Sequence, residues 1–201
     1  MKNIFYLILA IALLACNKTM AANVQKLPQP DVEQSTVSLM KLLNTRQSAR
    51  AYDSSKQIDK QTLSEILWAA FGVNQYGKRT IATARNEQNL KVFVLRQDGI
   101  WLYNAKENQL EKISDENAIP YTAEKQPFVS DAPLHLVYTS SDSHWGHDHA
   151  GSAYQNVYLY TTAKGLSTVI RGLINFDALH KALKLNDDEF VIAHQPIGYA
   201  K

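Results

Sequence analysis

The feature that most constrains the fold is the dipeptide Asp98-Gly99, which lies between two short runs of β-branched and aromatic residues. The runs are 91–96 (KVFVLR) and 100–103 (IWLY). Asp-Gly in this setting is a strong signal for a tight β-hairpin, because glycine adopts a positive φ without steric cost. We therefore expect an antiparallel sheet, and the apolar run 133–139 (PLHLVYT) indicates a central strand of it.

Apolar residues recur with a helical period in four other segments. These segments are 36–43, 63–71, 150–164 and 175–183. Asp59 is suited to cap the second helix and Gly72 to end it. We expect residues 104–131 to be rich in loops, with one helical turn, and a last strand at 190–194. Helices interleaved with few strands predict an α+β fold, in which helices cover a mostly antiparallel sheet.

The amino terminus resembles a bacterial lipoprotein signal. Lys2 precedes an apolar run of 12 residues at 4–15, which is short for a membrane span and typical of a signal peptide. The run ends at Cys16, the only cysteine of the chain, where a lipobox would place its lipidated residue. The alternative is an ordinary signal peptide cleaved near residues 20–22. Either interpretation predicts export, and the lipoprotein interpretation places the protein in the bacterial cell envelope, anchored through Cys16.

Three segments follow from this interpretation: a signal at 1–15, a lipid-anchored tether at 16–34 and one folded domain at 35–201. The tether is polar and contains Pro28 and Pro30 without any period. The formal net charge of the 201 residues is only +2, and no basic cluster contradicts that balance, which argues against nucleic-acid binding. The membrane contact that we expect is the lipid anchor alone.

The first candidate binding residues are Arg46, Ser48 and Arg50, at the end of the first helical segment. Two forked guanidinium groups with a hydroxyl between them suit a phosphate. If the turn stays helical, Arg46 and Arg50 face the same side. The alternative is a solvated helix end with its usual terminal cations.

Two other stretches invite a binding interpretation. Residues 72–79 (GVNQYGKR) nearly match a P-loop, but Arg79 stands where a hydroxyl is needed and the segment follows a helix. Residues 144–149 (HWGHDH) contain three histidines, which can bind a transition metal. No cysteine or glutamate adjoins them, so we favour a lid before the next helix and predict no metal site.

The order of motifs resembles the FMN-dependent nitroreductase family over nearly all of residues 35–201. Six segments of the sequence resemble the family's motifs. They are Arg46-x-Ser48-x-Arg50-x-Tyr52, the helix 63–74, Thr83-Ala84-Arg85-Asn86-x-Gln88, Ala153-x-Gln155-Asn156-x-Tyr158-Leu159, Gly165-Leu166-x-Thr168-Val169 and Ile197-Gly198-Tyr199. The branch that looks most similar contains the flavin dehydrogenases that oxidise azoline rings in peptides.

The resemblance implies FMN as cofactor and assigns roles to eight residues. Arg46, Ser48 and Arg50 match positions that hold the phosphate and ribityl chain. Thr83, Asn86 and Gln88 match positions in the segment that lies against the flavin ring. Arg171 and Gly172 match a pair whose backbone amides face the N5 and O4 edge of the flavin. We expect Tyr76, Arg85 and the 144–149 segment, including His147, to line the substrate pocket.

The resemblance also implies a homodimer in which both chains contact each flavin. The flavin would accept a hydride from a small-molecule donor and pass it to a small-molecule acceptor in a ping-pong cycle, so no catalytic side chain is needed. A second hypothesis stays open, in which an envelope lipoprotein uses the same fold to bind a ligand or partner without catalysis.

Overall fold

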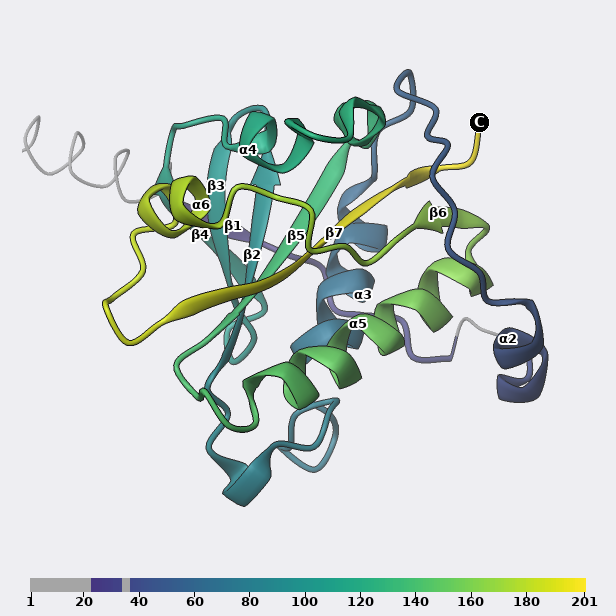
Figure 1. The fold of residues 1–201 in the computed structure, drawn as a ribbon. Coiled ribbons are helices and arrows are strands. Elements are labelled where there is room, and N and C mark those ends of the chain that lie inside the picture. The colour runs from purple at the N-terminus through teal and green to yellow at the C-terminus, as the bar shows by residue number, and fades with distance from the viewer. Residues whose placement is uncertain (1–22, 34–36) are drawn as a thin grey trace, which may run out of the picture.

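The computed structural model describes residues 23–33 and 37–201, which form one antiparallel sheet with helices on both of its faces (Figure 1). The strand order is β1-β4-β3-β2-β5-β7-β6. The strands are β1 (Val24–Lys26), β2 (Leu90–Arg96), β3 (Gly99–Asn104), β4 (Gln109–Ser114), β5 (Leu134–Ser140), β6 (Leu166–Thr168) and β7 (Phe190–Tyr199). The helices are α2 (Leu39–Thr45), α3 (Lys60–Phe71), α4 (Ile119–Ala123), α5 (Gly146–Ala163) and α6 (Phe176–Ala182), with 3-10 turns η1 (Ala84–Asn86) and η2 (Pro127–Asp131).

The sheet has a hydrophobic core on each face because successive side chains of a strand point to opposite sides. In β2, Val92 and Val94 pack into the core that α3 and α5 cover. Phe93 and Leu95 pack into the other core, which α6 and the α4 segment cover. The central strands are therefore apolar at nearly every position, as the run 91–96 suggested. The expected α+β fold, a mostly antiparallel sheet covered by helices, is confirmed.

The predicted hairpin and the second helix are confirmed in detail. Strands β2 and β3 pair antiparallel around the Asp98-Gly99 turn, with Arg96 opposite Gly99. Gly99 has a φ of +132°, and a Cβ there would lie 2.3 Å from the Ser114 carbonyl oxygen. Asp59 caps α3 by accepting a hydrogen bond from the Thr62 amide at 2.9 Å, and Gly72 ends the helix.

Two segments differ from their predicted structure because their pairing is non-local. Strand β1 pairs with β4 and Leu27 is buried, so the sheet extends into the predicted tether, and the boundary at residue 35 is wrong for this segment. Strand β4 lies within 104–131, which we expected to be loop-rich. The sequence of β4 is too polar to predict a strand. The strand forms because it pairs with β3 on one side and β1 on the other.

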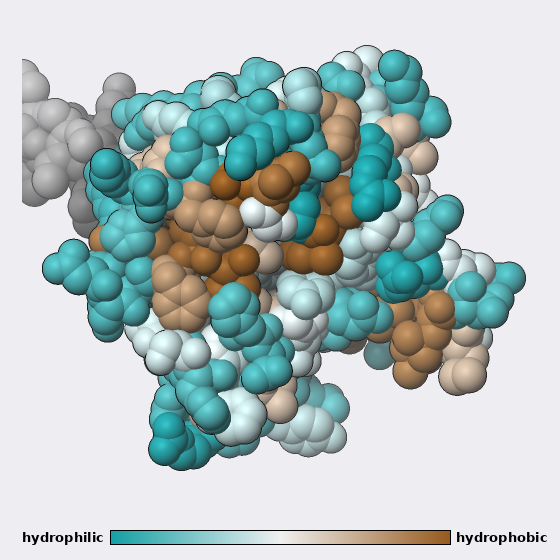
Figure 2. Space-filling view, in the orientation of Figure 1, coloured by the Kyte–Doolittle hydropathy of each residue, from teal (hydrophilic) through white to brown (hydrophobic). Residues whose placement is uncertain are grey.

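Helix α2 keeps the predicted amphipathic pattern but leaves its apolar face uncovered within one chain. Leu39, Met40 and Leu43 are exposed, with 74% of Met40 accessible. Figure 2 shows apolar side chains gathered over this helix at the right of the view. Such a face is normally covered in the functional state.

The predicted signal segment 1–15 and the lipidation site Cys16 lie outside the described residues. Among residues 23–33 and 37–201, no helix is long and apolar enough to cross a membrane.

Candidate functional site

The Arg46–Arg50 segment leaves α2 and continues as an irregular strand-like stretch beside β6. Helix α2 ends at Thr45, and Arg46 has φ −58° and ψ 128°, so the helical arrangement that we expected for the two arginines is wrong. The Ala49 amide donates to the Thr168 carbonyl at 2.9 Å. This bond fixes the segment against the end of the sheet, in a position that no local periodicity could reveal.

Tyr158 of α5 connects this segment to the core. Its hydroxyl lies 2.9 Å from the Ser48 hydroxyl and accepts the Ile170 amide at 2.8 Å. The Arg46 guanidinium carbon lies 5.0 Å from the centre of the Tyr158 ring. Arg46 and Ser48 therefore face the same side, towards Tyr158. When the Tyr158 hydroxyl donates to Ser48, the Ser48 hydrogen is available to a ligand.

Arg46 and Arg50 carry charges that the described part of the chain does not neutralise. Arg50 is exposed and Arg46 is half-buried, and no ion pair within residues 23–33 and 37–201 involves either of them. Two guanidinium groups and a hydroxyl on one segment present donors in the forked geometry that a phosphate accepts. The residues present thus fit a phosphate group.

The 83–88 loop is held in an unusual backbone conformation. Arg85, Asn86 and Gln88 have positive φ values of 50°, 57° and 54°. The loop is closed by bonds from the Gln88 amide to Thr83 Oγ1 and from Gln88 Nε2 to Asn86 Oδ1, at 3.3 and 3.1 Å. Arg79 Nε donates to Gln88 Oε1 at 2.8 Å. Non-glycine residues in this region are strained, and such strain concentrates at functional sites.

His149, which we had considered only as part of the 144–149 segment, anchors this loop. Its Nε2 accepts the Ala84 amide at 2.8 Å, so the neutral ring carries its hydrogen on Nδ1, 3.3 Å from Asn89 Oδ1. The predicted lid is wrong, because residues 146–149 form the first turn of α5 and His149 is buried. The spacing of His149, Ala153 and Val157 already places His149 on the inner helix face.

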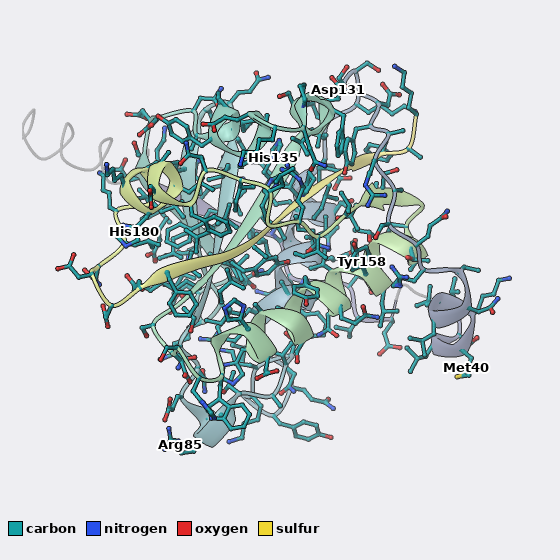
Figure 3. The ribbon with its side chains drawn as sticks, in the orientation of Figure 1. Met40, Arg85, Asp131, His135, Tyr158 and His180 are labelled. Carbon is teal, nitrogen blue, oxygen red and sulfur yellow. The ribbon has the colours of Figure 1, made fainter. Side chains whose placement is uncertain are left out.

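The two predicted binding segments, 46–50 and 83–88, contact helix α5 at different points along its length. His149 contacts the 83–88 loop and Tyr158 contacts Ser48, and nine residues of α-helix correspond to about 14 Å. Figure 3 shows Arg85 and Tyr158 well separated. The structure does not bring Thr83, Asn86 and Gln88 against Arg46, Ser48 and Arg50 within one chain.

The Arg171-Gly172 pair lies where the chain leaves β6 and passes β7. Arg171 exchanges both backbone hydrogen bonds with His194, each at 2.9 Å. The Arg171 amide is therefore already occupied, so the expectation that it faces a ligand is wrong, and the same expectation for Gly172 stays a prediction. Gly172 is exposed, and a Cβ there would approach only Phe176, at 3.9 Å.

A buried chain of side chains runs inward from Arg171. Arg171 Nη1 lies 3.1 Å from His194 Nδ1, His194 Nε2 lies 3.0 Å from His135 Nδ1, and His135 Nε2 lies 2.9 Å from the Ala132 carbonyl. Arginine can only donate, so His194 Nδ1 accepts from Arg171, His194 Nε2 donates to His135 Nδ1, and His135 Nε2 donates to the Ala132 carbonyl. Each ring therefore has one accepting nitrogen and is neutral. Burial lowers the pKa of His135 to about 4 and that of His194 well below its ordinary value.

The three predicted pocket residues are accessible but do not form one described cavity. Tyr76 is 78% exposed, Arg85 forms an ion pair with Glu87 at 3.0 Å, and the His147 ring lies 5.8 Å from that of Phe190. Within residues 23–33 and 37–201, no group of three or more His, Cys, Asp or Glu side chains is placed to hold a metal ion.

The sequence and the structure of this chain can be compared with those of known proteins. The model of the nitroreductase family matches residues 43–199. This chain belongs to the nitroreductase family. A Methanocaldococcus jannaschii protein named as a nitroreductase is 30% identical over 190 residues, which cover 84% of this chain and 93% of the relative.

Solved structures of nitroreductases share the fold. A Ralstonia eutropha protein described as a nitroreductase superposes with a TM-score of 0.80 and 32% identity, covering 89% of this chain and 90% of its own. An FMN-dependent nitroreductase of Clostridium difficile gives a TM-score of 0.60 at 16% identity, over 81% and 88% of the two chains. A chain of an Escherichia coli microcin synthetase complex gives 0.65 at 16% identity, over 88% and 79%. The last two likenesses are evidence of the fold alone.

Proposed function

We propose that this nitroreductase-family protein is an FMN-dependent oxidoreductase that moves a hydride between two small molecules. The observation that carries the proposal is that Arg46 and Arg50, which flank Ser48 in the sequence, form no ion pair within the described residues. These residues would hold the phosphate, and Tyr158 would keep the Ser48 hydroxyl in place.

The remaining residues would enclose the flavin ring. Bound FMN supplies the hydride chemistry through its ring. The amide of the exposed residue Gly172 would donate to the N5 and O4 edge, and Thr83, Asn86 and Gln88 would lie against the ring. Tyr76, Arg85 and His147 would line the space for the substrate. The motif order most resembles the azoline-oxidising branch, which we retain as part of the proposal.

The site that we propose is completed by a second copy of the chain. The resemblance implies that both chains contact each flavin, and the phosphate segment and the 83–88 loop, attached about 14 Å apart along α5, would then come from different chains. The exposed apolar face of α2 gives the homodimer a surface to bury. Light scattering of the purified protein would measure the dimer, and a monomer at micromolar concentration would contradict it.

We further propose that the protein is exported and anchored to the cell envelope through lipidated Cys16. The support is the apolar run 4–15 followed by the single cysteine. Cys16→Ala should move the protein from the membrane fraction to the soluble fraction. An unchanged distribution would overturn the anchor. The nature of the electron donor then depends on what the envelope supplies.

The experiment that tests the function is the visible absorption spectrum of the full chain after incubation with FMN and removal of free flavin. A yellow protein with about one FMN per chain is the expected result. A protein that takes up no FMN would contradict the proposal. It would favour the alternative, in which the fold serves as a binding module without catalysis.

A further inference from the structure

The guanidinium of Arg171 is a buried cation, and its hydrogen-bond partners among the described residues are all neutral groups. Its residue is 9% exposed. Nε donates to Gln126 Oε1 at 2.8 Å and Nη2 to the Leu173 carbonyl at 2.6 Å. Nη1 donates to the Thr122 carbonyl and to His194 Nδ1. No ion pair in the described part of the chain includes Arg171.

The neighbours hold this charge in place without cancelling it. The oriented bonds through His194 and His135 keep both rings neutral, because the acceptor nitrogen of each ring faces its donor. The phenol of Tyr52 also stays neutral, since burial raises its pKa. A buried charge is normally paired with an opposite charge, and one without a partner is a candidate for a functional role.

The charge lies next to the part of the site that is open. Gly172, the following residue, is exposed. The loop after it is fastened to the α4 segment by two bonds of Asn175, one from its amide to the Tyr121 carbonyl and one from Nδ2 to Glu124 Oε1, both 2.9 Å. Arg171 and Asn175 thus fix the loop at both ends, and the charge cannot move away from Gly172.

We propose that Arg171 is the counter-ion of an anionic group bound beside Gly172, and that it makes the site bind reduced FMN more tightly than oxidised FMN. This inference rests on the proposed function. A hydride brings two electrons and one proton, so oxidised FMN that accepts one gains a negative charge on its ring, and the donor is oxidised by the same two electrons. A cation that prefers the charged form therefore favours hydride uptake.

The test compares the affinity of the full chain for oxidised FMN and for dithionite-reduced FMN under anaerobic conditions. We expect Arg171→Gln to weaken binding of reduced FMN about tenfold more than binding of oxidised FMN, a typical size for one charge interaction inside a protein. Arg171→Lys keeps the charge and should retain most of the preference. His135→Asn keeps Arg171 and should change both affinities by the same factor.

Three other outcomes would contradict the inference, and they show whether the proposed function also fails. If Arg171→Gln weakens both forms equally, Arg171 is only structural and the inference is overturned, while the proposed function stands. If that variant does not fold, the wild type still decides, because equal or weaker binding of the reduced form overturns the inference. If the wild type binds FMN in neither state, the proposed function and the inference both fail.

Discussion

The hydroxyl of Tyr158 lies 2.9 Å from that of Ser48, a residue 110 positions earlier in the chain. The same hydroxyl accepts the Ile170 amide at 2.8 Å. One side chain of α5 therefore joins the phosphate segment to the stretch that leads from β6 to Gly172. The proposed phosphate and ring sites are coupled through this residue.

Tyr158→Phe removes only that hydroxyl, and we expect two effects. The Ile170 amide loses its partner, which should lower the free energy of unfolding by about 1 kcal/mol, the typical worth of one hydrogen bond. FMN affinity should also fall, because Ser48 is no longer oriented. Urea denaturation and FMN titration measure the two effects. Tyr76→Phe is the control for stability, since Tyr76 is exposed, and an equal loss of unfolding free energy in both variants would contradict the prediction.

Arg46→Ala and Arg50→Ala should each weaken FMN binding about 10- to 150-fold, since one charge-assisted contact is worth roughly 1.5–3 kcal/mol. Fluorescence quenching of FMN on titration with protein measures the dissociation constant. Lys106→Ala, which removes an exposed cation near the β3–β4 turn, should leave it unchanged. Full flavin occupancy in both arginine variants would show that the phosphate lies elsewhere.

His149→Ala should release the 83–88 loop, because the Ala84 amide loses its acceptor and the buried ring is removed. We expect faster hydrogen exchange at Ala84 and a loss of about 1–3 kcal/mol in unfolding free energy. His147→Ala is a matched control two residues away, with an exposed side chain. The prediction is wrong if both variants exchange the loop amides at the wild-type rate.

The buried histidines make stability depend on pH. The pKa of His135 is about 4 in the folded protein and 6.5 in its ordinary state, so between these values the unfolded chain binds more protons. Unfolding free energy should therefore fall as pH drops from 6.5 towards 4, by up to about 1.4 kcal/mol per pH unit for each histidine.

Urea unfolding at several pH values from 7.5 to 4.5 measures this slope. His135→Leu should reduce it, whereas His144→Gln, an exposed control, should leave it unchanged. A free energy of unfolding that stays constant over this range in the wild type would contradict the assignment of two neutral rings. Five carboxyl groups have pKa values lowered from their ordinary values of 3.8 or 4.5, so their effect on the free energy of unfolding falls mainly below this pH range.

The sequence by itself determined the elements that depend on near neighbours. The Asp98-Gly99 hairpin, the Asp59 cap and the α3 stripe follow from turn chemistry and from a period of a few residues, and the structure confirms them. The motif order was sufficient to indicate the family and its α+β fold. The assignments of Arg46, Ser48 and Arg50 to a phosphate, and of the 83–88 loop to a flavin ring, remain predictions that the structure makes testable.

Only the tertiary structure decided the features that depend on distant partners. Strand β1 exists because β4 lies beside it, and Ser48 faces Tyr158 because the Ala49 amide bonds to Thr168. The sequence assigns Arg171 a role only through its backbone amide, and only packing shows that its side chain is buried against His194. Local patterns record which residues favour a helix, strand or turn, whereas burial and hydrogen-bond partners arise when segments far apart in the chain come together.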